Sequence, residues 1–212
     1  MLINNWYVAA WSHEVTTRKP IGVRMLGCDF VLFRNADGRV ACLSDVCCHR
    51  GGALSGGKVN SARVACPYHG WNFDSNGNCV LIPSMGEGAP IPRRARIDSY
   101  PTQEKYGWVW AFLGDLPEAE RPAIPDLFPE YDDPAGWHRV SYGFEAKANW
   151  MRFEENSLDT AHTTFVHQQF GAIRNPKLEV FPLEHKEWGA RVARVKPAPG
   201  ADQKTGEMAK LL

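Results

Sequence analysis

The sequence predicts an α+β protein with an all-β domain at its N-terminus, followed by a second domain that mixes helix and strands. Short aromatic and β-branched segments separated by glycine turns fill residues 1–115, as is typical of an all-β domain. A stretch rich in proline and acidic residues follows at 116–136 and is predicted to be a linker or a wrapping segment rather than an independent core. Residues 137–212 combine a helical pattern with strand-like segments, and we expect them to form the second domain.

Composition narrows the class of protein. The chain has 212 residues and a formal net charge of zero, which argues against a nucleic-acid or anionic-membrane partner. No stretch approaches the ~20 apolar residues of a membrane span, and no apolar signal segment opens the chain. Six cysteines without an evident disulfide framework suit a reducing compartment, so we expect a cytoplasmic protein.

Strand-like segments can be placed in order along the first domain. A hairpin turn is predicted at 35–38, where Asp37 and Gly38 form the strongest short turn signal, and residues 83–92 are predicted to be a loop. We expect strands at Asn5–Trp11, Val23–Leu26, Phe30–Arg34, Val40–Leu43, Val64–Ala65, Cys79–Ile82 and Gly107–Leu113.

The second domain should begin with a strand at Trp137–Ala146. A helix is predicted over Asn149–Val166, with Asn149 as its N-cap. Val180–Leu183 and Ala190–Val195 are predicted to be strands of a second sheet.

Two short segments of the first domain carry metal-ligand residue types. They read Cys47-Cys48-His49 and Cys66-Pro67-Tyr68-His69, and they supply two thiolates and two imidazoles. This is the ligand set of a Rieske [2Fe–2S] centre, in which two histidines replace two cysteines on one iron. Cys47 and Cys66 are predicted to hold the inner iron, and His49 and His69 the outer one.

The flanking residues favour this interpretation over two others. Glycines beside both pairs would let backbone N–H groups approach bridging sulfides closely. A Cys2His2 zinc site would use the same side chains without requiring those glycines. Six cysteines could also form disulfides, but the chain is long and lacks a signal segment. The Cys-x-His spacing selects Cys47, so Cys48 is predicted to be a packed thiol.

A second constellation lies on the predicted helix, in the order Asn156, Asp159, His162 and His167. Two histidines and one carboxylate with open positions form the facial triad of non-haem Fe(II) oxygenases. Asp159 and His162 can share one helix face and hydrogen-bond. His162 and His167 would diverge by about 140° on an ideal helix, so both can reach one metal only if the backbone becomes irregular near Thr164–His167.

Together the two motifs resemble the oxygenase component, or α subunit, of the Rieske non-haem iron oxygenases. The opening Asn5-Trp6-Tyr7-Val8-Ala9 and the spacing of the second constellation are most similar to the vanillate O-demethylase and dicamba-type monooxygenase branch. The resemblance implies that residues 137–212 are the first, incomplete part of a helix-grip-like catalytic domain. It also implies a mononuclear Fe(II) with His162 and His167 as ligands. Asp159 matches the carboxylate that bridges to a cluster histidine of the neighbouring subunit, and Asn156 matches a polar residue beside the iron.

The same resemblance implies a function. Electrons from NAD(P)H would pass through a reductase or ferredoxin to the Rieske cluster and on to the mononuclear Fe(II). O₂ would then hydroxylate or O-demethylate a small aromatic substrate, in a head-to-tail homotrimer. The family's carboxylate ligand to iron lies far downstream of the histidines, so we expect it beyond Leu212. Two alternatives stay open, namely a ring-hydroxylating dioxygenase α subunit and a Rieske electron carrier or truncated paralogue without oxygenase activity.

Overall fold

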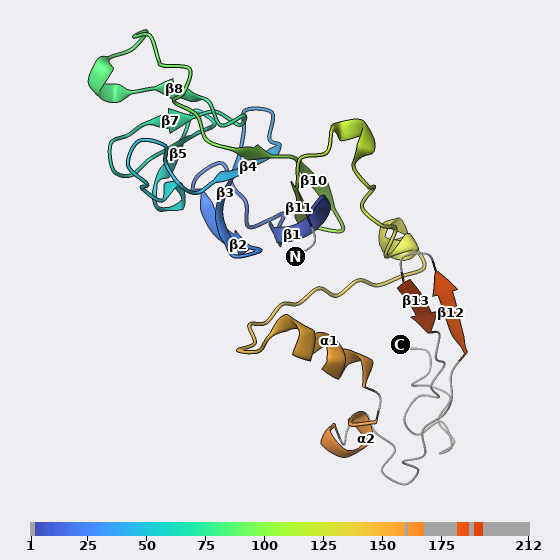
Figure 1. Cartoon of the computed structure of the whole chain (residues 1–212). Coiled ribbons are helices and arrows are strands. Elements are labelled where there is room, and N and C mark those ends of the chain that lie inside the picture. The colour runs from blue at the N-terminus through green and yellow to red at the C-terminus, as the bar shows by residue number, and fades with distance from the viewer. Residues whose placement is uncertain (1–2, 160, 168–181, 187–188, 193–212) are drawn as a thin grey trace. The chain divides into compact units, whose positions relative to one another are not determined.

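The structure, a computed structural model, describes residues 3–159, 161–167, 182–186 and 189–192 (Figure 1). The chain divides into two compact units after Val140. Among the helices that the structure describes, none is long and apolar enough to cross a membrane.

The first unit is built from antiparallel strands in three sheets (Figure 1). One sheet has the order β1 (Asn5–Trp11), β11 (Trp108–Leu113) and β10 (Thr102–Lys105). The second has the order β2 (Ile21–Met25), β3 (Cys28–Arg34), β4 (Val40–Ser44) and β9 (Ser99–Tyr100). The third contains β5 (Lys58–Asn60), β6 (Arg63–Ala65), β7 (Asn72–Phe73) and β8 (Cys79–Leu81). Short 3₁₀ helices lie at Leu54–Gly56 (η1), Pro83–Met85 (η2), Glu118–Glu120 (η3) and Pro129–Asp132 (η4).

Strand β3 is buried on both faces and separates two apolar cores. Phe30 and Leu32 pack into a core with residues of β4 and β11. Val31 and Phe33 point the other way and pack into a core that contains Cys47 and Cys66. The alternation of side chains along a strand explains this division. The apolar core therefore reaches directly beneath the two predicted cluster loops.

The predicted hairpin turn at 35–38 is confirmed. The Asn35 side-chain oxygen accepts hydrogen bonds from the backbone N–H groups of Asp37 and Arg39, both at 3.0 Å. Gly38 has a positive φ of 76°, a conformation that costs glycine little. The turn joins β3 to β4, with Arg34 paired to Val40.

The proline-rich stretch at 116–136 packs on the first unit. Ile124 and Tyr131 join an aromatic cluster with Tyr106 and Trp110. The Tyr106 hydroxyl donates to the Asp126 carboxylate at 2.7 Å and accepts from the Leu127 backbone N–H at 3.0 Å. The first unit consequently extends past this stretch to Val140.

The second unit contains α1 (Trp150–Leu158), α2 (Thr163–Val166) and an antiparallel pair, β12 (Leu183–Lys186) and β13 (Gly189–Val192). The predicted N-cap is confirmed, because the Asn149 side chain accepts from the Met151 N–H at 2.9 Å. The predicted strand at Trp137–Ala146 is wrong: these residues pair with no neighbouring strand in the described part of the chain. A strand forms only where its backbone groups find such partners.

The prediction of one helix from Asn149 to Val166 is also wrong. The helix ends at Leu158, because Asp159 has an extended backbone (φ −76°, ψ 108°). The Asp159 side chain then accepts a hydrogen bond from the Ala161 N–H at 2.7 Å, a local bond that competes with continued helix. The predicted strands at Val180–Leu183 and Ala190–Val195 fall partly outside the described residues, and β12 and β13 overlap their described ends.

Candidate metal centres

The first cluster loop closes on its own backbone immediately after Cys47. The Cys47 N–H donates to the Gly52 carbonyl at 3.0 Å, and the Gly51 N–H donates back to the Cys47 carbonyl at 2.8 Å. Gly51 has a positive φ of 72°, which a residue with a side chain rarely adopts. The loop is therefore a tight turn that presents Cys47 and His49 from one short segment.

The second loop repeats this pattern. The Cys66 N–H donates to the Trp71 carbonyl at 2.8 Å, and the Gly70 N–H donates to the Cys66 carbonyl at 3.0 Å. Gly70 also has a positive φ, of 70°. In both loops the cysteine begins a turn that closes four and five residues later, so the two loops present their ligand pairs in the same way.

The four predicted ligand residues divide between the interior and the surface of the first unit. The Cys47 and Cys66 side chains are 2% and 4% exposed and belong to one apolar core. The His49 and His69 side chains are exposed, and their ring centroids lie 4.5 Å apart. Two imidazoles bound to one metal ion through bonds of about 2.1 Å would have centroids roughly 5 Å apart. The thiols thus face the interior while the imidazoles converge at the surface.

Close contacts around the thiols fit a cluster with bridging sulfides. A Cβ atom at Gly52 would lie 3.1 Å from the Cys66 Sγ, so any larger residue would crowd the ligand. Burial and, to a lesser extent, the adjacent Cys66 thiol raise the pKa of the Cys47 thiol to about 11. Without iron the Cys47 thiol is neutral and suits an apolar core, and iron binding would displace its proton.

Aromatic rings flank both histidines. The Trp71 ring stacks on His49, with centroids 4.5 Å apart and an interplanar angle of 3°. Tyr68, which is 66% exposed, has its ring centroid 3.8 Å from that of His69. The position of Trp71 directly after the loop was the only sequence signal for this stacking. The prediction that Cys48 is a packed thiol is wrong, because this side chain is exposed.

The second constellation assembles where the helix breaks. His162 follows the break after α1, and His167 follows the end of α2. Their ring centroids lie 5.4 Å apart at an interplanar angle of 71°. This spacing fits two imidazoles on one metal ion, by the same estimate of roughly 5 Å. The irregular backbone predicted near Thr164–His167 is found where α2 ends, after Val166, whereas Thr163–Val166 are helical. The other break, at Asp159, lies before His162.

Asp159 lies beside His162 but does not form a well-aligned hydrogen bond with it. The Asp159 Oδ2 and His162 Nδ1 atoms are 3.4 Å apart, and Nδ1 is buried without a hydrogen-bond partner. The Ala161 N–H and, less strongly, His162 hold the pKa of the Asp159 carboxyl below its usual range. This carboxylate is half-exposed. Asn156 lies on α1 with an exposed side chain.

A third iron ligand is not found within the described part of the chain. No three His, Cys, Asp or Glu side chains gather there closely enough to hold a metal ion. Two histidines alone would leave most coordination positions of an iron ion without a protein ligand. The Rieske loops do not need such a group, since each iron of that cluster takes two protein ligands.

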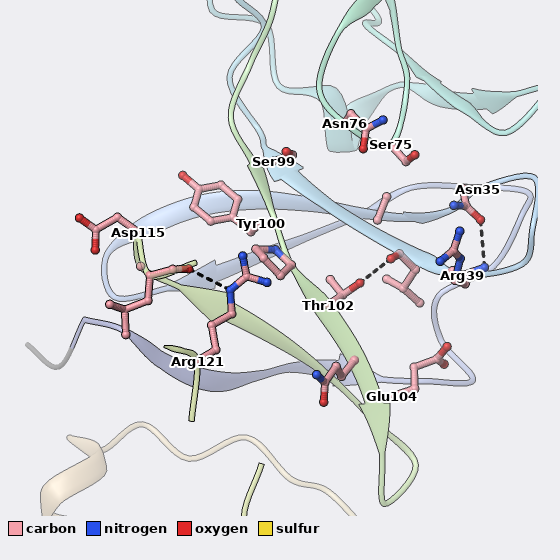
Figure 2. Close-up of a pocket in the computed structure, with 16 residues that line it drawn as sticks. Asn35, Arg39, Ser75, Asn76, Ser99, Tyr100, Thr102, Glu104, Asp115 and Arg121 are labelled. Carbon is pink, nitrogen blue, oxygen red and sulfur yellow. Dashed lines mark hydrogen bonds between the residues drawn. The ribbon is translucent and has the colours of Figure 1, made fainter. Parts of the chain in front are cut away.

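A groove of about 790 Å³ opens elsewhere in the first unit (Figure 2). It lies where β4 and β10 diverge, and the Thr102 hydroxyl bridges them by donating to the Val40 carbonyl at 2.6 Å. Arg39, Arg121 and Glu104 add charge to its walls. None of the predicted site residues lines this groove.

Comparison with known proteins agrees with the geometry of the loops. A family model described as the Rieske [2Fe-2S] domain matches residues 5–101. The oxygenase component of dicamba O-demethylase from Stenotrophomonas maltophilia is 38% identical over 165 residues, which cover 78% of this chain and 47% of that protein. The α subunit of phenoxybenzoate dioxygenase from Ectopseudomonas oleovorans is 35% identical over 181 residues, which cover 80% of this chain and 44% of that protein.

Solved structures give the same result. Dicamba monooxygenase bound to dicamba superposes with a TM-score of 0.67 at 37% identity, covering 78% of this chain and 48% of that one. NdmA of Pseudomonas putida CBB5 with caffeine gives a TM-score of 0.76 at 26% identity, covering 93% of this chain and 58% of that one. The chain spans about half the length of the curated relatives it matches. It carries a Rieske [2Fe–2S] domain and, over the part that it shares with them, is a homologue of the α subunits of Rieske non-haem iron oxygenases.

Proposed function

We propose that this chain is the electron-accepting part of an oxygenase component. In this proposal Cys47, His49, Cys66 and His69 hold a Rieske [2Fe–2S] cluster, and His162 and His167 contribute ligands to a mononuclear Fe(II). The protein would use O₂ to hydroxylate or O-demethylate a small aromatic substrate. When bound, the cluster supplies one-electron transfer and the mononuclear iron supplies O₂ activation.

The observation that carries the proposal is that both loops are closed by the same pattern of two backbone hydrogen bonds. Each loop turns its cysteine into the apolar core and its histidine to the surface. The buried thiolates would stabilise one iron out of contact with water. The exposed imidazoles would bring the other iron to the surface, where an electron can enter or leave.

The residues of the second unit support a site that receives those electrons. The helix α2 ends at Val166, before His167, and the rings of His162 and His167 converge there. Asp159 lies against His162 with its carboxylate half-exposed. A half-exposed carboxylate can reach a histidine of another subunit. We therefore propose that Asp159 links His162 to a cluster histidine of a neighbouring copy in a homotrimer, with Asn156 a polar neighbour of the iron.

Partners and substrate follow from the relatives. Dicamba O-demethylase and toluene-4-sulfonate monooxygenase are named for aromatic substrates, and phenoxybenzoate dioxygenase shares a similar identity with this chain. The proposal accordingly covers both monooxygenation and a ring-hydroxylating dioxygenase α subunit. A reductase or ferredoxin would deliver the electrons, and six free cysteines suit the cytoplasm.

Iron content and product formation test this function together. We expect about three irons per chain in the holoprotein, two in the cluster and one mononuclear. With a reductase, NADH and an aromatic methyl ether, an O-demethylase releases formaldehyde, whereas a dioxygenase forms a diol from an unsubstituted ring. Two irons per chain and a cluster that cycles without consuming organic substrate would instead identify an electron carrier, an alternative favoured by the missing third ligand among the described residues.

A further inference from the structure

A buried carboxylate two residues before Cys47 has no role in the function proposed so far. Asp45 is 6% exposed, and its two carboxylate oxygens accept hydrogen bonds from Ser55. The Ser55 backbone N–H donates to Oδ1 and the Ser55 hydroxyl donates to Oδ2, both at 2.6 Å. A carboxylate is buried at low cost only when hydrogen-bond donors compensate for its lost hydration. The two bonds from Ser55 provide this compensation.

The two residues hold the ends of the first cluster loop together. The Asp45 N–H donates to the Asp29 carbonyl on β3 at 3.0 Å, which anchors the start of the loop to the sheet. The Leu54 N–H donates to the Asp45 carbonyl at 3.1 Å, immediately before Ser55 in η1. Asp45 therefore fastens the start of the loop through its backbone and its end through its side chain.

A glycine on a neighbouring strand leaves space for this contact. A Cβ atom at Gly22 of β2 would lie 2.9 Å from both the Cβ and the Oγ of Ser55, and 3.7 Å from the Asp45 Oδ2. Any larger residue at position 22 would have to displace the Ser55 side chain. Gly22 of β2 and Ser55 of η1 thus pack around the carboxylate of Asp45.

The second cluster loop has a smaller counterpart. The Asn72 side chain donates to the Gly70 carbonyl at 2.7 Å, just after Cys66 and its turn. Within the part of the chain that the structure describes, Asp45 and Asn72 are the two buried polar or charged residues of the first unit's core. Asp45 lies just before the first cluster loop and Asn72 just after the second. The two buried polar side chains are therefore next to the predicted cluster ligands.

We propose that Asp45, through Ser55, is a positioning residue for the cluster: it fixes the Cys47 loop in the geometry that holds iron. The proposal rests on the proposed function, because it requires the cluster. Residues that orient metal ligands typically change metal affinity or activity by about 10–100-fold when they are removed. The effect should therefore appear in how firmly the cluster is held and in its spectrum.

Three variants test the positioning role in the holoprotein. We expect Asp45→Ala to lose its cluster to an iron chelator at least about tenfold faster than the parent protein. Its reduced cluster should also give a broadened EPR signal, because the loop samples several geometries. Asp45→Asn keeps an oxygen acceptor for the Ser55 N–H and should restore the loss rate to within about threefold. Gly22→Ala, which displaces Ser55 without touching Asp45, should accelerate cluster loss in the same direction.

Asp74→Ala provides the matched control. The Asp74 carboxylate accepts backbone hydrogen bonds from Asn76 and Asn78, both at 2.9 Å, in the turn between β7 and β8. Asp74→Ala removes backbone hydrogen bonds of the same kind in a turn outside the two cluster loops, so this variant should lose its cluster at the parent rate. Equal loss rates for Asp45→Ala and Asp74→Ala would overturn the positioning role. A parent protein that holds no histidine-ligated cluster would overturn the proposed function itself.

Discussion

Replacing Cys66 with alanine should abolish the iron–sulfur cluster. The Cys66 side chain lies in the apolar core with Leu54 and Phe73. One iron would keep a single protein ligand, so we expect the iron and acid-labile sulfide content to fall at least tenfold. The visible absorption of the cluster should disappear with it, and thermal unfolding should occur at a lower temperature because bound metal stabilises the folded state.

Cys42→Ala is the control for this loss. Cys42 is 1% exposed and lies in the other core, with Leu32 and Val109. Its removal leaves a small cavity that should destabilise the fold by about 1–2 kcal/mol while the iron content stays at the parent level. A Cys66→Ala protein that retained two irons and the parent spectrum would show that this thiol is not a ligand.

Asp159→Asn should slow electron delivery to the second iron strongly while the cluster remains intact. The amide oxygen can still accept the Ala161 N–H, so the backbone turn is kept. The negative charge that faces His162 at 3.4 Å is lost, and with it the carboxylate that we propose to join two histidines. We expect substrate-dependent reoxidation of the pre-reduced cluster to slow by about 10–100-fold, measured by stopped-flow absorption in the holoprotein.

Glu155→Gln separates this effect from a general change in the charge of the helix. Glu155 lies one turn earlier on α1, is also half-exposed and pairs with Arg152. Neutralising it should leave the reoxidation rate unchanged. An Asp159→Asn protein that turned over at the parent rate would remove Asp159 from the electron path.

Local patterns were enough to predict much of the first unit. The strand predicted at Asn5–Trp11 has those same bounds, and Val40–Leu43 falls within β4. These segments combine β-prone residues with clear turns, and the resulting sheet buries them on the expected faces. The strand β10, Thr102–Lys105, was missed because its four residues are polar or charged and show no apolar alternation.

The second unit shows where sequence patterns stop being sufficient. The periodicity around His162 predicted one continuous helix, but the Asp159 side chain bonds to the Ala161 N–H and ends it. Side-chain competition of this kind depends on a single rotamer, which periodicity does not encode. The segment at Trp137–Ala146 contains aromatic and β-branched residues, yet it finds no partner strand in the described part of the chain.

At the candidate cluster site, the spacing of cysteines and histidines indicated the candidate ligands. It did not indicate the residues that hold the ligand loop in place. Asp45 and Ser55 are ten residues apart, and their contact depends on the loop between them closing. Gly22 comes from a strand much earlier in the chain. Contacts of this kind arise from tertiary packing, and no local motif marks them.

The most direct test of the central claim is pulsed EPR of the reduced protein, combined with iron and sulfide analysis. If Cys47, Cys66, His49 and His69 hold a Rieske cluster, the cluster should contain two irons and two acid-labile sulfides per chain. The reduced signal should carry nitrogen couplings from two inequivalent imidazoles, and His69→Ala should remove one of them. Zinc without sulfide, or an iron–sulfur signal without nitrogen couplings, would contradict the assignment.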